Sequence, residues 1–155
     1  MLTKTTETAI QVLVLLALRN QSVPVSPARL AAHLDASVSY MAKITHLLVK
    51  AGLLQATRGA RGGVSLAASP SRIGLLSVVE ACQGKVLGDY CTGEIALEQT
   101  CAYHEAMYEL HEAIVGTLER WTIADLAARP TAASSVRGNV NCRMARAHTA
   151  SSQTQ

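Results

Sequence analysis

Apolar residues recur every three or four positions across residues 5–19, which predicts an amphipathic first helix. Its apolar positions fall on one broad face: Ala9, Val12, Leu13, Leu16 and Ala17. Residues 20–25 break this period, so they predict a loop that leads into the next helical stretch.

Two more helices follow, each with its own start signal. Ser26 can cap the free amides of a helix over residues 27–35, which opens with a proline. Ser37 can cap a helix over residues 38–51, and Gly52 is suited to end it in a left-handed conformation. The positions of these two helices that face the core are Leu30, Ala31, Leu34, Met41, Ile44, Leu48 and Val49.

A hairpin is predicted directly after the third helix. Short apolar strands at residues 53–57 and 64–67 flank the segment Arg58-Gly59-Ala60-Arg61-Gly62-Gly63, whose glycines permit the positive φ of a tight tip. Helix, turn, helix, strand, loop and strand in this order describe a winged helix-turn-helix. The expected fold class is therefore mainly α, with a small β-hairpin wing.

The second half predicts a short buried helix, an irregular segment and a long helix. The short helix covers residues 73–83, and residues 84–101 show no clean period. The long helix covers residues 102–120, and its apolar stripe consists of Met107, Leu110, Ile114, Val115 and Leu118. Thr122 can cap a last short helix, and residues 130–155, rich in Ser, Thr, Ala and Arg, predict a disordered tail.

Composition narrows the class of protein. The chain is 49% hydrophobic but has no Phe, so aliphatic side chains must fill its core. No run approaches the roughly 18 apolar residues needed to cross a bilayer, and no cleavage site follows the apolar run at residues 9–18. We therefore expect a cytoplasmic protein without a membrane partner.

Charge is divided unevenly along the chain. Residues 1–63 carry seven Lys or Arg and two acidic residues, whereas residues 64–155 carry seven basic and nine acidic residues. A basic first half suits a domain that binds a polyanion such as double-stranded DNA. The polar face of the helix at 38–51 and the hairpin tip supply the candidate DNA contacts: Ser37, Ser39, Tyr40, Lys43, His46, Arg58 and Arg61.

Several long segments also resemble one family of regulators. LTKTTETAIQVLVLLA, SVSYMAKITHLLVKAGLL, RGARGGVSLAASPSRIGLLSVVEA and CAYHEAMYELHEAIVGTLERWTIADL are similar to the IscR/NsrR family of bacterial winged-helix transcriptional regulators. The resemblance covers residues 1–129. It implies a homodimer, built around the long helix, that binds a near-palindromic operator. A 19-residue amphipathic helix on a small domain agrees, because its apolar stripe needs a partner.

The resemblance also implies a metal site. Many members hold an iron–sulfur cluster with three cysteines before the long helix, and Cys91 and Cys101 look like the first and last of these. The middle cysteine is missing. His104 matches a position where some members use a histidine ligand, and Glu7 matches an acidic ligand contributed by the partner subunit. Two thiolates, an imidazole and a carboxylate suit a 2Fe–2S cluster better than a cubane.

The remaining cysteines have simpler interpretations. Cys82 lies in the apolar helix at residues 73–83 and is expected to be a buried core thiol, and Cys142 lies in the predicted tail. A redox role for Cys82 remains an alternative.

The domain organisation follows from these assignments. Residues 1–83 form the winged-helix DNA-binding domain, and residues 84–101 form a segment that we call the sensor loop. Residues 102–129 form the dimerisation helix and a short terminal helix, and residues 130–155 form the tail.

Other functions also agree with the sequence. The same DNA-binding regulator could use a metal-free thiol switch, in which Cys91 and Cys101 form a disulfide or persulfide. A small metal-dependent enzyme is a third interpretation, although no nucleophile motif or phosphate-binding loop accompanies the Cys/His set. A protein-interaction module would leave the Arg/Gly hairpin unexplained.

Overall fold

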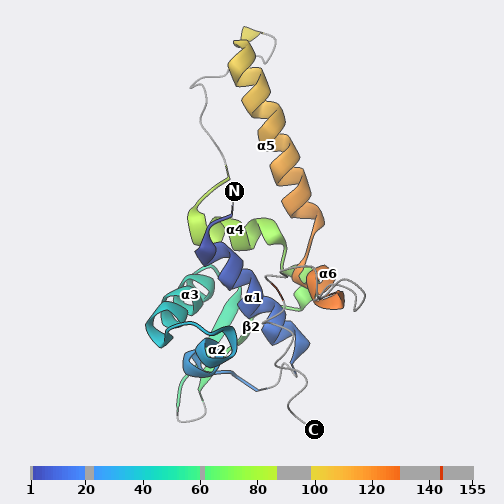
Figure 1. Cartoon of the computed structure of the whole chain (residues 1–155). Helices are drawn as coiled ribbons and strands as arrows, with labels where there is room; N and C mark the ends of the chain where they lie inside the picture. Colours follow the sequence, from blue (N-terminus) through green and yellow to red (C-terminus); the bar gives the residue numbers. More distant parts are fainter. Residues whose placement is uncertain (1, 20–22, 60–61, 87–98, 130–143, 145–155) are drawn as a thin grey trace, which may run out of the picture.

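The computed structural model of the chain describes residues 2–19, 23–59, 62–86, 99–129 and 144. Figure 1 shows a helical body with a hairpin at one end and a long helix, α5, that rises from the other. The elements follow the order α1, α2, α3, β1, β2, η1, α4, α5 and α6. This order confirms the mainly α fold with a two-stranded hairpin.

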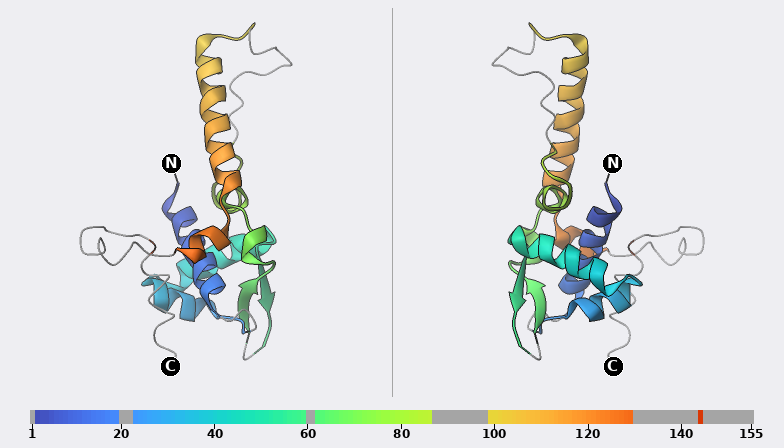
Figure 2. Two further views of the ribbon diagram at one scale, coloured as in Figure 1. Left: turned by 90° about the vertical axis from the view of Figure 1, so that its right-hand side faces the viewer. Right: turned by 90° about the vertical axis from the view of Figure 1, so that its left-hand side faces the viewer.

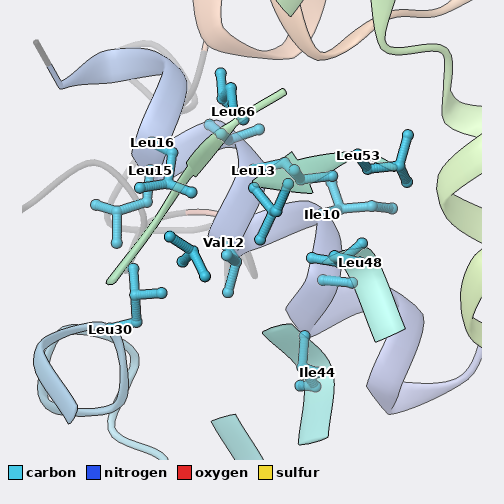
Figure 3. Packing of buried hydrophobic residues seen from close by; sticks show 14 of the residues in the cluster. Ile10, Val12, Leu13, Leu15, Leu16, Leu30, Ile44, Leu48, Leu53 and Leu66 are labelled. Carbon is cyan, nitrogen blue, oxygen red and sulfur yellow. The ribbon is translucent and has the colours of Figure 1, made fainter. Parts of the chain in front are cut away.

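Helix α1 (Lys4–Leu18) runs through the centre of the body. The sequence predicted one apolar face, and this is wrong, because residues 12–16 are five consecutive buried positions that cover the whole circumference. The reason is that α3, α4, α6 and β2 all pack against this helix. Figure 3 shows Val12, Leu13 and Leu15 among apolar side chains from other elements. Helix α1 is therefore the element around which the core forms.

Helices α2 (Pro27–Leu34) and α3 (Val38–Lys50) form the helix-turn-helix. Both predicted caps are confirmed, because the Ser26 hydroxyl accepts from the amide of Arg29 and the Ser37 hydroxyl accepts from the amide of Tyr40. The turn between the helices passes through Asp35, which has φ 52°. Most side chains disfavour this left-handed conformation, but the short polar side chain of Asp tolerates it. The left-handed residue ends α2 and turns the chain sharply, which brings the two helices together.

The hairpin pairs β1 (Leu54–Thr57) with β2 (Gly63–Leu66) in antiparallel register. A third segment joins it, because Val25 exchanges two backbone hydrogen bonds of 2.9 Å with Val64. Gly63 makes this junction possible. A Cβ atom at this position would lie 2.5 Å from the Val25 carbonyl and 2.8 Å from the Ser26 amide nitrogen. The start of α2 is therefore fixed against the base of the hairpin.

We expect Gly63→Ala to destabilise the protein by about 1–3 kcal/mol, because the added methyl group meets backbone atoms that cannot rotate away. Gly116→Ala is the matched control, since nothing lies within 4 Å of its Cβ position in the middle of α5. That substitution should stabilise the protein by up to about 1 kcal/mol. Urea unfolding of both variants measures the two effects. A Gly63→Ala protein as stable as wild type would contradict this packing.

Helix α4 (Leu75–Gln83) follows the 3-10 turn η1 (Pro70–Arg72) and buries Val78 and Val79. Helix α5 (Ala102–Arg120) comes next among the described elements, and α6 (Ile123–Ala128) returns the chain to the body. Two backbone hydrogen bonds hold the base of α5, from Leu75 N–H to the Trp121 carbonyl and from Ile123 N–H to the Ile73 carbonyl. The Thr122 cap is confirmed as part of a capping box.

Helix α5 differs from the other long helices because none of its 19 residues is buried. Leu110 and Ile114, which belong to the predicted apolar stripe, are 49% and 41% exposed. Figure 2 shows the helix extending away from the body in both side views. None of the helices that the structure describes has the length and apolar character needed to cross a membrane. The predicted tail lies outside the described residues, except for Met144, which packs against the core cluster.

Candidate nucleic-acid interface and metal-binding residues

The outer face of α3 carries the polar residues expected to contact DNA. Ser39, Lys43 and His46 are exposed on the side of α3 away from the buried Met41, Ile44 and Leu48, and Ser37 is the exposed N-cap residue just before the helix. Their hydroxyl, ammonium and imidazole groups are able to bond base edges and phosphates. The N-terminal end of such a helix is the part that usually enters a major groove.

Two residues at the start of α3 differ from the expected pattern, in which polar side chains are exposed and apolar side chains are buried. Tyr40 is half-buried, and its hydroxyl donates a 3.5 Å hydrogen bond to Thr5 of α1. Val38, which sequence reasoning passed over, is 54% exposed at the first position of α3. An apolar side chain there suits contact with a thymine methyl group. The sequence carried no signal for this exposure, because Val38 lies three residues before the buried Met41 and therefore shares the helical period of the core positions.

The hairpin extends from the same body as a second possible contact surface. Arg58 is exposed directly after β1, and Gly59 next to it adopts φ 114°. Arg61 lies outside the described residues. Figure 2 shows the hairpin at the end of the molecule opposite the free end of α5. A cation on such a projecting tip is able to reach a phosphate or a narrow minor groove beside a helix-bound major groove.

Two of the proposed metal ligands lie together at the free end of α5. Cys101 is the exposed N-cap residue, and His104 lies one helical turn further on. Cys101 and His104 occupy the N-cap and N3 positions of α5, whose side chains are near enough to interact across the start of a helix. Glu7 belongs to α1 in the body, whereas α5 begins at the end farthest from it (Figure 1). Cys91 lies outside the described residues.

No group of three His, Cys, Asp or Glu side chains in the described part of one chain converges on a possible metal position. The donor chemistry at the α5 end nevertheless fits an iron–sulfur cluster, because it pairs a thiol with an imidazole. A carboxylate from the α1 position would have to come from a second copy of the chain. The described residues therefore supply a thiol, an imidazole and a carboxylate to one metal site only if two copies of the chain associate.

Cys82 lies apart from this set, on α4. It is half-buried against the core, and burial raises the pKa of its thiol more than a hydrogen bond with Thr6 lowers it. A protonated thiol is a poor ligand and a poor nucleophile at neutral pH. Its neighbour Gln83 accepts hydrogen bonds from the Thr3 amide and the Thr6 hydroxyl, which ties α4 to the start of α1.

A basic cluster on α1 and α2 was also missed. The Arg19 guanidinium donates to Nε2 of His33, and Arg29 is close enough to affect the charge of both groups. Arg29 and His33 are four residues apart on α2, so their shared face was visible in the sequence. Arg19 could not be assigned to it, because its position depends on how α1 packs against α2.

A helix-turn-helix followed by a hairpin, with polar groups on the outer face of the second helix, defines a winged-helix transcriptional regulator. Residues 2–129 match the Rrf2 family, described as iron-dependent transcriptional regulators. The chain belongs to this family. The match confirms the resemblance to NsrR- and IscR-type regulators drawn from the sequence.

Two relatives by sequence and one solved structure are similar to this chain. The chain is 30% identical over 129 residues to the HTH-type transcriptional regulator NsrR of Geobacillus kaustophilus, covering 81% of this chain and 88% of that protein. It is 31% identical over 112 residues to the HTH-type transcriptional regulator IscR of Serratia proteamaculans, covering 71% and 68%. The structure of CymR, the global cysteine regulator of B. subtilis, superposes with a TM-score of 0.68 at 23% identity, covering 83% of this chain and 96% of CymR.

Proposed function

We propose that this regulator binds a near-palindromic operator as a homodimer and that a 2Fe–2S cluster sets its affinity for DNA. The ligands would be Cys91, Cys101 and His104 of one subunit with Glu7 of the other. The observation that carries this proposal is that Cys101 and His104 occupy the N-cap and N3 positions at the free end of α5. The family description as iron-dependent regulators supports it.

The case for a dimer rests on the unburied apolar surface of α5. Leu110 and Ile114 are exposed, and Ile114 also borders a groove of about 490 Å³ at the base of the helix. The groove lies between α4, α5 and the N-terminal segment, and its lining residues are Leu2, Val79, Gln83, Val86, Ala113, Ile114, Thr117 and Leu118. Because burial of apolar area is the main favourable term in association, a second copy of α5 is the partner that suits this stripe.

We expect the double variant Leu110→Gln, Ile114→Gln to sediment as a monomer at micromolar concentration, whereas wild type sediments as a dimer. Both side chains are already exposed in the single chain, so each subunit should keep its fold. The control is Glu109→Gln with Glu112→Gln, two exposed positions on α5 outside the apolar stripe. If wild type is a monomer, or if the double variant remains a dimer, this assignment of the interface is wrong.

The dimer also completes the ligand set. Within one chain, Cys101 and Glu7 belong to elements that lie apart, since α5 begins away from the body (Figure 1). Exchange of α5 between two subunits would bring the free end of one helix toward the body of the other. Thiolates and imidazole suit an iron–sulfur site, and the cluster would supply a redox-sensitive group there.

The described residues also connect the sensor loop to the rest of the protein. Nδ1 of His111, on α5, lies 2.9 Å from the carbonyl oxygen of Val86 and donates to it. Val86 follows α4, and α4 packs against both α3 and α5. A change around the loop would therefore alter the position of α5 relative to the helix-turn-helix. In a dimer, such a shift would change the spacing between the two copies of α3, on which operator affinity depends.

The metal-free thiol switch is the second candidate. The exposure of Cys101 favours it, because an accessible thiol is able to form a disulfide or persulfide. Colour separates the two candidates: anaerobically purified protein with iron, sulfide and visible absorbance supports the cluster, and colourless protein with a Cys91–Cys101 disulfide supports the switch.

Selection of bound sequences from a pool of randomised DNA duplexes tests the DNA-binding part of this proposal. The expected product is a near-palindromic site whose two halves are spaced by about one helical turn or a multiple of it. An enriched site without two-fold symmetry, or no enrichment, would contradict a dimeric regulator that reads DNA with α3.

A further inference from the structure

We infer that Arg19 and Arg29, with His33 holding Arg19 in place, form a second contact surface for the phosphate backbone of the operator duplex. We call these three residues the α1–α2 basic cluster. The inference rests on the proposed DNA-binding function and extends it to residues outside α3 and the hairpin.

The geometry of the cluster brings cations together. The guanidinium of Arg19, at the end of α1, donates from Nη2 to Nε2 of His33 in the last turn of α2. Since Nε2 accepts this bond, His33 is neutral in this arrangement. Arg29 lies on the same face of α2, one turn before His33, and is exposed. The cluster therefore presents two guanidinium groups, one of which is oriented by an imidazole.

The cluster has excess positive charge. Burial, followed by the charges of Arg19 and Arg29, lowers the pKa of His33, and burial together with Arg29 lowers the pKa of Arg19. The charged neighbours that act on these groups are thus cations. Among the described residues, Nε of Arg19 is also buried without a hydrogen-bond acceptor. Like charges held this close repel each other, and an anion bound between them would relieve that repulsion.

The position of α2 indicates that the anion is a phosphate of bound DNA. The start of α2 is fixed to the hairpin base by the Val25–Val64 hydrogen bonds and by the close approach of Gly63 to Ser26. Arg29 follows Ser26 by three residues, so it lies in the turn of α2 nearest the hairpin. In helix-turn-helix proteins the first helix crosses the DNA backbone while the second enters the major groove. A duplex bound by both α3 and the hairpin would therefore pass its phosphates along the start of α2.

The test compares Arg19→Gln and Arg29→Gln with Arg72→Gln, which removes an exposed charge from the 3-10 turn η1. Fluorescence anisotropy over a salt series measures binding to the selected operator and to a scrambled duplex of equal length. Each arginine variant should weaken binding to both duplexes, by roughly two- to fivefold. The slope of log K against log salt should become shallower by about one unit per variant. Arg72→Gln should retain both the affinity and the slope of wild type.

The role of His33 has its own readout. His33→Gln keeps a side-chain acceptor for Arg19 and should retain the wild-type slope, whereas His33→Leu removes the acceptor and should reproduce part of the Arg19→Gln effect. Wild-type slopes in the arginine variants, or weaker binding without a change in slope, would overturn the inference. If wild type bound no duplex at all, the proposed function would fail instead. If only the Arg58 variant lost binding, the proposed function would stand and this cluster would be excluded.

Discussion

Cys101→Ala and Cys91→Ala will each leave the anaerobically purified protein without iron–sulfur absorbance. Thiolates bind the iron of such clusters most strongly, so removal of either one should abolish assembly. His104→Ala should reduce cluster stability or shift its reduction potential. Glu7→Ala should have a milder effect, because an oxygen ligand matches this iron less well and water can replace it. Ultraviolet–visible spectra with iron and sulfide analysis measure the order of effects.

The matched control for the cysteine variants is Cys82→Ala. Cys82 lies on α4, and burial raises the pKa of its thiol, so its removal should leave the absorbance intact. Cys142→Ala should do the same. Loss of colour in Cys82→Ala while His104→Ala stays coloured would show that the ligand set is Cys82, Cys91 and Cys101. If wild type never holds iron after anaerobic reconstitution, the thiol switch is the remaining candidate.

Replacement of Arg58 and Arg61 by Ala should weaken operator binding by about tenfold or more near physiological salt. The reason is that each arginine on the hairpin is expected to contact a phosphate and displace a counterion. The slope of log K against log salt should become shallower by about one unit per lost contact, hence by about two for the double variant. Anisotropy titrations over a salt series measure both quantities.

Arg72→Ala serves as the control for this variant, because it removes a positive charge outside the hairpin, outside α3 and outside the sensor loop. Its affinity and slope should equal those of wild type. If the double arginine variant binds its operator as tightly as wild type at every salt concentration, the hairpin does not contact DNA.

The DNA-binding half of the fold could be predicted because its signals are local. Ser26 and Ser37 are caps that act within one turn, and Gly52 ends α3 with φ 72° as its position indicated. The apolar period of α3 likewise identified Met41, Ile44 and Leu48 as core residues. In each case the physical cause lies within about four residues of the signal.

Features that depend on packing between distant segments could not be predicted. Burial around the whole of α1 requires four other elements to enclose it, and no periodicity within the helix indicates this. The Val25–Val64 pairing and the Arg19–His33 hydrogen bond likewise join segments that only the tertiary fold brings together. The distance between Glu7 and Cys101 could not be predicted either, because the proposed role of Glu7 as a ligand depends on how a second subunit packs against the first.

The most direct test of the proposed function is the operator affinity of one protein preparation in two states. Anaerobically purified dimer is titrated against the selected operator by fluorescence anisotropy, before and after removal of iron by a chelator under reducing conditions. The expected result is a change in dissociation constant of about tenfold or more, which corresponds to about 1.4 kcal/mol, and reversal of this change on reconstitution with iron and sulfide. Equal affinity in the two states, with iron present in the first and absent from the second, would contradict control of DNA binding by the cluster.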